Sequence, residues 1–348
     1  YGQDEEKLTV KPSGRILMDA GAFHADHYND KFNDGVAIPD VRIGFGAQYG
    51  KWKSKVDVGF AYAKISLKDI FMEYVFNKEN LLRGGYFVHQ FGLQSATSSS
   101  FKITMEEPAS NQAFFNSRLV GLMFLHNKGK FFGTLSLFAE SEAMKQSTDK
   151  LGNEGYGMMS RLVYRPLRDP GKILHIGLSG AFESPRYSAK PEDNHRSYAL
   201  KSEFPTRIAR VAAQQADITE AKMLYKFTPE VTAAIGRLAI ESQYFFVTVN
   251  RDEGLPRYQA SGAYALLRGL VKGNGYVYSD GDSGIGTPAP GSMELVLGYN
   301  YTDLSDHKAR ILGGRVNDWS LTFNYYPNKY MIWRVRGSLT KATDRAGY

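Results

Sequence analysis

Apolar and polar residues alternate along almost the whole chain, in blocks of about ten residues. In the block VRIGFGAQYG, Val41, Ile43 and Phe45 fall on one face, whereas Arg42 and Gly44 fall on the other. This period of two residues is typical of β-strands, because successive side chains point to opposite faces of a sheet. The repeated blocks predict strands at 14–23, 39–50, 54–63, 67–77, 81–90, 117–127, 130–141, 156–166, 172–183, 219–236, 238–249, 257–268, 291–303, 316–327 and 329–341.

The two faces of these predicted strands differ in character. The polar faces carry Arg, Lys, Glu and Asp in mid-strand beside many glycines, which suits a wet interior. The apolar faces tend to end in aromatic residues, as an interfacial girdle in a membrane requires: Tyr49, Tyr62, Phe76, Tyr301 and Tyr325. These features predict an all-β fold, a transmembrane antiparallel β-barrel. A soluble barrel or a large sandwich, which would also alternate, is the alternative.

The connections between the predicted strands alternate in length. Long ones lie near 24–38, 91–115, 142–155, 183–217 and 303–313, and the short ones read YGKWKS, FNKEN, HNKGK, PLRDPGK and YPNK. Short periplasmic turns and long extracellular loops are typical of outer-membrane barrels. A closed barrel is also the all-β arrangement that leaves no strand edge facing lipid.

The number of predicted strands leaves one question open. Bacterial single-chain barrels have an even number of strands, so we expect 16, of which 15 are recognisable in this chain. Either a further strand lies within 196–210, or the closing strand lies beyond Tyr348. The last residues, KATDRAGY, do not alternate like a closing strand, which favours the second interpretation.

Composition narrows the class of protein. The chain has 348 residues, with 22 Tyr, 21 Phe, 35 Gly and no Cys, so disulfide scaffolds, thiolate metal sites and cysteine catalysis are excluded. No apolar run approaches the roughly 18 residues of a membrane-spanning helix. A hydrophobic fraction of 43% excludes disorder. We expect one barrel domain over residues 1–348, and the polar start YGQDEEKLTV is expected to be a mature N-terminus whose export signal has been removed.

Several blocks resemble, in order and spacing, the phosphate-selective porin O and P family. SLKDIFMEYVFN is similar to a family strand with a lysine–aspartate pair followed by alternating aromatics. GGYFVHQFGLQSATSS is similar to the strand that enters the third loop, and ITMEEPASNQAFFNSRLVG to the rest of that loop and the arginine after it, here Arg118. SRLVYRPLRDPGKILHIGLSGAF and SMELVLGYNYTDLSD…GGRVNDWSLTFNYYPN resemble the turn before the ninth strand and a late hairpin. Together the blocks cover most of residues 14–340.

The resemblance implies a Gram-negative outer-membrane porin that assembles as a homotrimer. The chain departs from the family at three places. Gln90 stands where the family usually has proline, FPTRIAR at 204–210 replaces an arginine–proline–glutamate element, and the final strand is not found. Phosphate specificity is therefore one expectation, beside passage of general anions or of mixed solutes.

The formal net charge of +7, from 43 Lys plus Arg against 36 Asp plus Glu, is consistent with an anion pathway. Cationic groups inside a pore replace part of the hydration that an anion loses, and arginine binds two oxygens of an oxyanion at once. The expected pathway residues are Arg42, Lys55, Arg83, Lys102, Arg118, Arg161, Arg165, Lys222, Lys226, Arg334 and Arg336. The alternative is that these cations pair across neighbouring strands with inward acids and stiffen the wall, the acids being Asp57, Glu73, Glu241 and Glu294.

Two long connections are candidates for entering the lumen. Loop 91–115 has a run of hydroxyl residues that can donate to phosphate oxygens, or it is an ordinary polar loop; the run is Ser95, Thr97, Ser98, Ser99 and Ser100, before Lys102 and Thr104. Segment 183–217 is rich in both charges and too long for a casual connection, so it either enters the lumen or caps the surface.

Other chemical motifs are weak. GDSG at 281–284 looks like a serine-protease nucleophile signature but lies in a Gly/Ser/Asp/Pro-rich connection. His24, Asp26 and His27 have metal-ligating side chains, yet a solvated loop explains them better. There is no nucleotide fingerprint before a helix, and the aromatics lie on the face opposite the cations, which argues against nucleic-acid binding.

The sequence therefore predicts a passive outer-membrane channel for small anions, phosphate among them, with a lumen narrowed by inward-folded loops. It is expected to be in contact with lipid and lipopolysaccharide, and to use no metal, cofactor or catalysis. One alternative is a non-transporting or general-solute barrel that serves as a subunit of a larger outer-membrane complex. A second is an outer-membrane barrel hydrolase, for which the seven histidines offer no obvious serine partner.

Overall fold

A computed structural model describes residues 6–27, 30–98, 101–140, 144–145, 147, 149, 153–185 and 196–346. Fifteen strands form one antiparallel sheet that follows the order of the chain, with β9 paired directly to β12. Their bounds are β1 (Thr9–Gly21), β2 (Gly35–Tyr49), β3 (Trp52–Gly59), β4 (Ser66–Val75), β5 (Asn80–Val88), β6 (Arg118–Lys128), β7 (Phe131–Ala139), β8 (Tyr156–Asp169), β9 (Lys172–Glu183), β12 (Ala221–Ile235), β13 (Leu238–Arg251), β14 (Tyr258–Lys272), β17 (Ser292–Asp306), β18 (Ile311–Asn328) and β19 (Met331–Arg345). Each predicted strand corresponds to one of these, so the all-β fold is confirmed.

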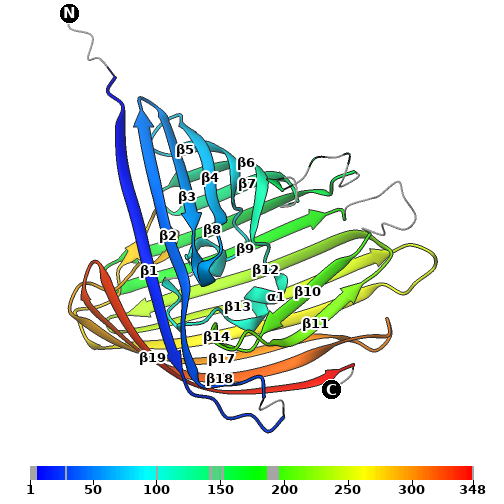
Figure 1. Ribbon diagram of the computed structural model, residues 1–348. Coiled ribbons are helices and arrows are strands. Elements are labelled where there is room, and N and C mark those ends of the chain that lie inside the picture. Colours follow the sequence, from blue (N-terminus) through cyan, green and yellow to red (C-terminus); the bar gives the residue numbers. More distant parts are fainter. Residues whose placement is uncertain are drawn as a thin grey trace, which may run out of the picture.

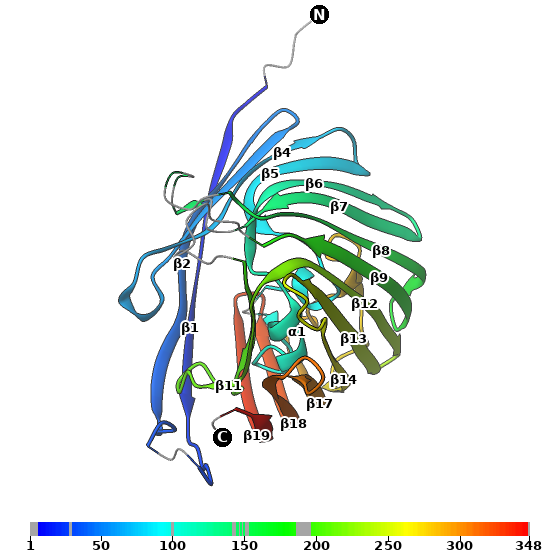
Figure 2. The same ribbon diagram turned by 90° about the vertical axis from the view of Figure 1, so that its right-hand side faces the viewer.

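The sheet curves into the wall of a barrel (Figures 1 and 2). β1 pairs with β2 and β19 pairs with β18, and in the described residues these two end strands are not paired with each other. Residues 196–210 do not supply another wall strand, because β10 (Tyr198–Glu203) pairs only with β11 (Ala212–Ile218) in a separate hairpin. The sixteenth strand stays a prediction.

The alternation of the sequence predicts correctly which side chains face outward. Leu297 and Trp333 are 46% and 61% exposed, whereas the neighbouring Val296 is fully buried. Tyr299 and Trp319 pack against each other on the outer face in a tilted arrangement, with their ring centroids 4.5 Å apart. None of the helices among the described residues is long and apolar enough to span a membrane.

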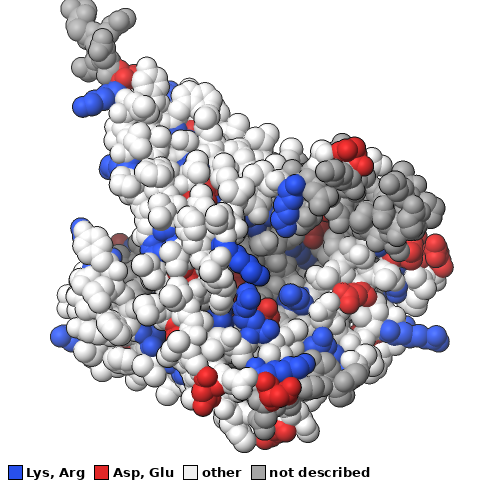
Figure 3. Space-filling model, viewed as in Figure 1, with Lys and Arg blue, Asp and Glu red and all other residues white. Residues whose placement is uncertain are grey.

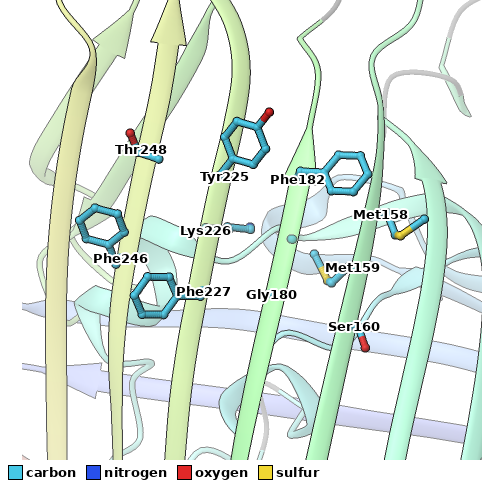
Figure 4. A pocket seen from close by; sticks show the side chains of 11 residues that line it. Met158, Met159, Ser160, Gly180, Phe182, Tyr225, Lys226, Phe227, Phe246 and Thr248 are labelled. Carbon is cyan, nitrogen blue, oxygen red and sulfur yellow. The ribbon is translucent and has the colours of Figure 1, made fainter.

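The outer face also has an apolar hollow of about 440 Å³, over strands β8, β9, β12 and β13. Figure 4 shows the side chains of Met158, Phe182, Tyr225 and Phe227 around Gly180, which has no side chain to fill the space. A Cβ atom at Gly180 would meet only the Lys226 carbonyl oxygen, at 4.0 Å, so the hollow arises from the missing side chain.

The connections follow the predicted alternation with two exceptions. Four long connections occur at one end of the barrel, at 22–34, 89–117, 140–155 and 184–220. The predicted long loop at 303–313 is wrong, because β17 and β18 continue and leave only 307–310 between them. At the turn end, residues 273–291 form a long connection that includes β15 (Tyr278–Ser279) and β16 (Gly284–Ile285).

The connection 89–117, here called the inner loop, lies inside the curve of the sheet (Figure 2), the first of the two alternatives that the sequence left open. It contains the short helices η2 (Gln94–Ala96) and α1 (Ala109–Phe114), and Figure 2 shows α1 inside the curve of the sheet. The Asn324 amide donates to the Ile103 carbonyl at 2.8 Å, which ties the loop to β18. On the neighbouring strand β17, Asn300 accepts a hydrogen bond from the Ser110 backbone N–H at 3.0 Å. Two of the predicted hydroxyl residues, Ser99 and Ser100, lie outside the described residues.

The hairpin β10–β11 lies against α1 and strand β18, so the described part of segment 183–217 also enters the mouth of the barrel. Its Leu200, Ala216 and Ile218 belong to a buried apolar cluster with Phe114 and Phe245. Apolar packing of this kind fixes the hairpin and the inner loop against one side of the wall.

Candidate pore lining

Charged side chains, with more cations than carboxylates, gather on the inner face of the first strands. Five cations from β1–β4 and β6 surround three carboxylates: Arg15, Arg42, Lys55, Lys68 and Arg118 around Asp40, Asp57 and Asp69. We call this group the basic cluster. In Figure 3 Lys and Arg side chains gather around the central hollow of the molecule, with Asp and Glu side chains among them.

The carboxylates of the basic cluster are shared between cations. Asp40 accepts hydrogen bonds from Arg15 Nε at 2.8 Å and from Arg42 Nε at 2.9 Å. Asp69 accepts from Arg118 Nε at 2.8 Å, and Lys55 Nζ lies 3.5 Å away from it. Arg15 also donates to the Ser98 hydroxyl of the inner loop at 2.5 Å.

Lys68 contributes charge without a direct partner, since no carboxylate among the described residues lies within 4.0 Å of its amine. A β-bulge brings it into the cluster. Val56 pairs with Ile70 and Val58 with Leu67, so Lys68 and Asp69 together stand opposite the single residue Asp57. A bulge re-aims side chains, and here both consecutive residues reach the interior. Strict alternation would place them on opposite faces, so alternation alone does not identify both as inward.

Two glycines make room for the charged groups. A Cβ atom at Gly44 would lie 1.9 Å from Asp57 Oδ1, and one at Gly59 would lie 2.7 Å from Lys68 Cε. A larger residue at either position would therefore displace the Asp57 carboxylate or the Lys68 side chain from its place in the cluster. The many glycines on the polar faces of the first strands thus leave space for long inward side chains.

A second group of charges, on β8, β9 and β12, is buried in the wall. Arg161 and Glu230 are both fully buried and form a two-pronged ion pair, with Nε–Oε1 at 2.9 Å and Nη2–Oε2 at 2.8 Å. His175 Nε2 lies 2.8 Å from the same carboxylate. Arg161 also donates to Gln90 at 3.0 Å, so the glutamine that replaces the family's proline ties the start of the inner loop to this pair. We call Arg161, Glu230 and His175 the buried triad.

The buried triad holds the connection 273–291 inside the barrel. Arg161 donates to the Ser283 carbonyl at 2.8 Å, and the Tyr278 hydroxyl lies 2.8 Å from His175 Nδ1. Nearby, Arg165 is fully buried and donates to the Gly129 carbonyl at 2.9 Å. Arg161 and Arg165, which were expected on the anion pathway, are thus fully buried and brace the wall and the connection.

The remaining predicted residues fall into different environments. Lys226 and Arg336 donate to carbonyls of the inner loop, at Phe114 (2.7 Å) and Thr104 (2.6 Å), and so fasten that loop. Arg83 pairs with Glu73 at 2.9 Å. Lys222 was expected to face inward, but it is exposed beside the register shift that separates Ala221 from Met223, where the alternation fails.

Lys102 and Arg334 lie at a cavity of about 310 Å³ between the inner loop and connection 273–291. Lys102 Nζ donates to the Gln94 carbonyl at 2.5 Å, and burial lowers the pKa of this loop amine. At the mouth of the barrel, Glu106 of the inner loop lies 3.4 Å from Arg207. Burial raises the pKa of the Glu106 carboxyl to about 7, despite the opposing effect of Arg207.

The profile of the phosphate-selective porin O and P family matches residues 10–340. The chain belongs to this family. No curated protein matches it in sequence. Its fold is similar to that of an anion-selective porin from Comamonas acidovorans, with a TM-score of 0.59 and 11% identity over 97% of this chain and 90% of that one. It is also similar to the trimer form of OmpT, an outer membrane protein of Vibrio cholerae, with a TM-score of 0.58 and 8% identity over 97% and 90% of the two chains.

This porin is therefore an outer-membrane β-barrel, as the sequence predicted. Its GDSG motif does not assemble a serine nucleophile with a histidine base. The Ser283 hydroxyl lies 3.0 Å from the Tyr278 hydroxyl, which itself stands between Ser283 and His175. His24 and Asp26 are almost fully exposed with 3.5 Å between them, and no metal-binding group of three side chains occurs in the described parts of the porin.

Sequence reasoning missed several residues that organise the interior of the porin. Arg15 was omitted because the block RILMDA gives no clean alternation, although its Ile16 and Met18 prove to face outward. The polar side of β12 suggested Lys226 but not Glu230, whose role depends on its register with β9. Tyr276 and Tyr278 are buried by the inward fold of a connection whose composition suggested a solvated loop.

Proposed function

We propose that this porin is a passive channel for small anions, with oxyanions such as phosphate among its solutes. The observation that carries the proposal is the basic cluster, in which five cations share three carboxylates on the inner wall. Its side chains remain in contact with water, since Lys55 is 42% and Arg15 is 24% exposed. The proposal includes no catalytic step and no cofactor.

The surplus of positive charge gives an energetic reason for anion preference. An anion that enters a narrow lumen loses hydration, and fixed cations restore part of it. Two unit charges 4 Å apart interact by about 4 kcal/mol at an effective dielectric of about 20, so even a small surplus matters. Arg42 and Arg118 present planar forks that can hold two oxygens of an oxyanion, and Lys68 adds a mobile point charge.

The comparisons add support of a more general kind. One protein of similar fold is an anion-selective porin, and another is an outer-membrane protein in a trimer form. By analogy we propose that this porin assembles as a homotrimer in contact with outer-membrane lipid and lipopolysaccharide.

The test is the reversal potential of the folded porin in a planar bilayer under a potassium chloride gradient. We expect chloride to be more permeant than potassium, and the preference to weaken as ionic strength rises, because salt screens the cluster. If phosphate binds the cluster, added phosphate reduces the chloride current in a saturable way. A potassium preference at low salt would overturn the proposal.

A scaffold barrel in an outer-membrane complex is the second candidate function. It is favoured by the extent to which the inner loop, the β10–β11 hairpin and connection 273–291 occupy the interior. A folded porin that carries no ionic current would support this candidate instead of the channel.

A further inference from the structure

The cavity between the inner loop and connection 273–291 differs from the basic cluster because its lining carries both signs of charge. The charged lining residues are Lys102, Glu241, Arg268, Asp282 and Arg334. Arg268 is already neutralised by Glu294, with Nε–Oε2 at 2.8 Å. The other charged residues, two carboxylates and two cations, therefore line the same cavity.

On the acidic side, Glu241 is held in place and keeps acceptor capacity. Its Oε2 atom accepts hydrogen bonds from Gln94 Nε2 at 2.6 Å and from the Tyr264 hydroxyl at 2.8 Å. This contact fixes the orientation of the Gln94 amide, whose oxygen is buried and has no hydrogen-bond partner among the described residues. The Glu241 carboxylate can accept further hydrogen bonds, so a solute that brings a charged N–H group is favoured here.

On the basic side, Lys102 and Arg334 supply donors. Lys102 Nζ uses one of its three N–H groups on the Gln94 carbonyl. Arg334 also lines the cavity, and its Nε donates to Asn324 at 3.1 Å. A carboxylate placed between these groups would receive charge-assisted hydrogen bonds.

We propose that this cavity binds small zwitterions that carry one ammonium and one carboxylate group, free amino acids being the simplest members. A simple anion is attracted by Arg334 and Lys102 but repelled by Glu241, and a simple cation meets the reverse. A zwitterion satisfies both sides. The volume of about 310 Å³ is far more than one water molecule needs, which leaves room for an amino acid with a small side chain. The inference rests on the proposed pore function, which brings solutes to the cavity.

The experiment measures the chloride current of the folded porin in a planar bilayer while alanine is added. Alanine carries no net charge, so it lowers the current only by occupying the pathway. Propionate and ethylamine, at equal ionic strength, serve as probes that retain one of the two charged groups each. We expect saturable block by alanine, with a half-blocking concentration at least tenfold lower than that of either single-charge probe.

Two variants test the two sides of the cavity separately. Glu241→Gln keeps oxygen and nitrogen atoms for the neighbours of Glu241 but removes its charge, and Arg334→Gln removes the facing cation. Both should raise the half-blocking concentration of alanine about tenfold, while they shift the reversal potential in opposite directions. A purely electrostatic effect on the current would shift the two reversal potentials in opposite directions, but it would not weaken the alanine block in both variants. Glu79→Gln is the matched control, because Glu79 pairs with Lys128 in a turn outside the cavity, and its alanine block should be unchanged.

The outcomes separate this inference from the proposed channel. Absence of chloride current in the wild-type porin would overturn the channel itself. A normal chloride current that alanine leaves unchanged, or an alanine block that neither Glu241→Gln nor Arg334→Gln weakens, would overturn the zwitterion site alone.

Discussion

The basic cluster and the buried triad contain similar side chains but differ in burial and in the balance of charge. In the cluster, five cations share three carboxylates and remain in contact with water. In the triad, Arg161 and Glu230 are both fully buried and matched one to one, with His175 as a third member. Position on an inner face therefore does not make an arginine part of a pathway. The exposure of its side chain and the local balance of charge determine whether it can interact with a solute.

Physical chemistry explains why each arrangement suits its place. A buried charge without its partner is strongly destabilising, so each charge buried in the wall needs an opposite charge beside it. A partly exposed charge is solvated and screened, and an unmatched surplus is then tolerated. The first arrangement fixes connection 273–291 in the barrel. The second would leave positive charge available to a solute in the proposed channel.

The largest expected effect is on stability, at the buried triad. Arg161→Met leaves Glu230 buried without its main partner, and we expect the free energy of unfolding to fall by about 3–5 kcal/mol. Arg83→Met, which breaks the partly exposed pair with Glu73, should cost about 1 kcal/mol or less. Urea unfolding of the porin in lipid, followed by tryptophan fluorescence, measures both. Equal losses in the two variants would remove the distinction between the regions, and the double variant Arg161→Met/Glu230→Met should recover most of the stability.

The next effect is on ion selectivity, at the basic cluster. Arg42→Glu combined with Lys68→Glu changes the charge of the cluster by four units, more than its surplus of cations over carboxylates. We expect the preference to change from chloride to potassium at low salt, with the difference shrinking as salt rises. Retention of chloride preference would show that the cluster does not lie on the ion pathway. Lys222→Glu, at an exposed position on β12, is the control and should change selectivity little.

The smallest effect is a pH dependence at the mouth. Burial raises the pKa of Glu106 from its usual 4.5 to about 7, and Asp19, Glu107, Arg207 and Arg336 are the charged groups around it. As pH rises through 7, Glu106 gains negative charge, so anion preference should fall, by less than about twofold. The raised pKa also means that this group lowers stability as pH rises from about 4.5 to 7. Reversal potentials between pH 6 and pH 8 should show a step that Glu106→Gln abolishes. A step of the same size in that variant would assign it to another group.

Much of the wall was predictable because alternation is a local property of the sequence. Every wall strand and the outward faces of Leu297 and Trp333 followed from it. Features that depend on the register between strands could not be predicted from the sequence. The bulge at Lys68 and the pairing of Arg161 with Glu230 across β9 both require knowledge of which residues lie side by side.

The same reason explains which site prediction needed correction. Arg161 lies at an inward position, as alternation indicates, but its carboxylate partner is two strands away in the sheet and more than sixty residues away in the chain. A charge reversal at Arg161 would thus place two carboxylates together in the wall and report on folding. The selectivity test belongs at the basic cluster.

One measurement tests the central claim most directly: the reversal potentials of Lys68→Gln and Arg83→Gln, compared with the wild-type porin in the same potassium chloride gradient. Each variant loses one inward positive charge, but Lys68 has no carboxylate partner among the described residues and Arg83 is paired with Glu73. At low salt the account predicts that Lys68→Gln lowers the chloride-to-potassium permeability ratio roughly fivefold, equivalent to about 1 kcal/mol, and that Arg83→Gln changes it much less. Equal shifts in the two variants, or no shift in Lys68→Gln, would contradict it.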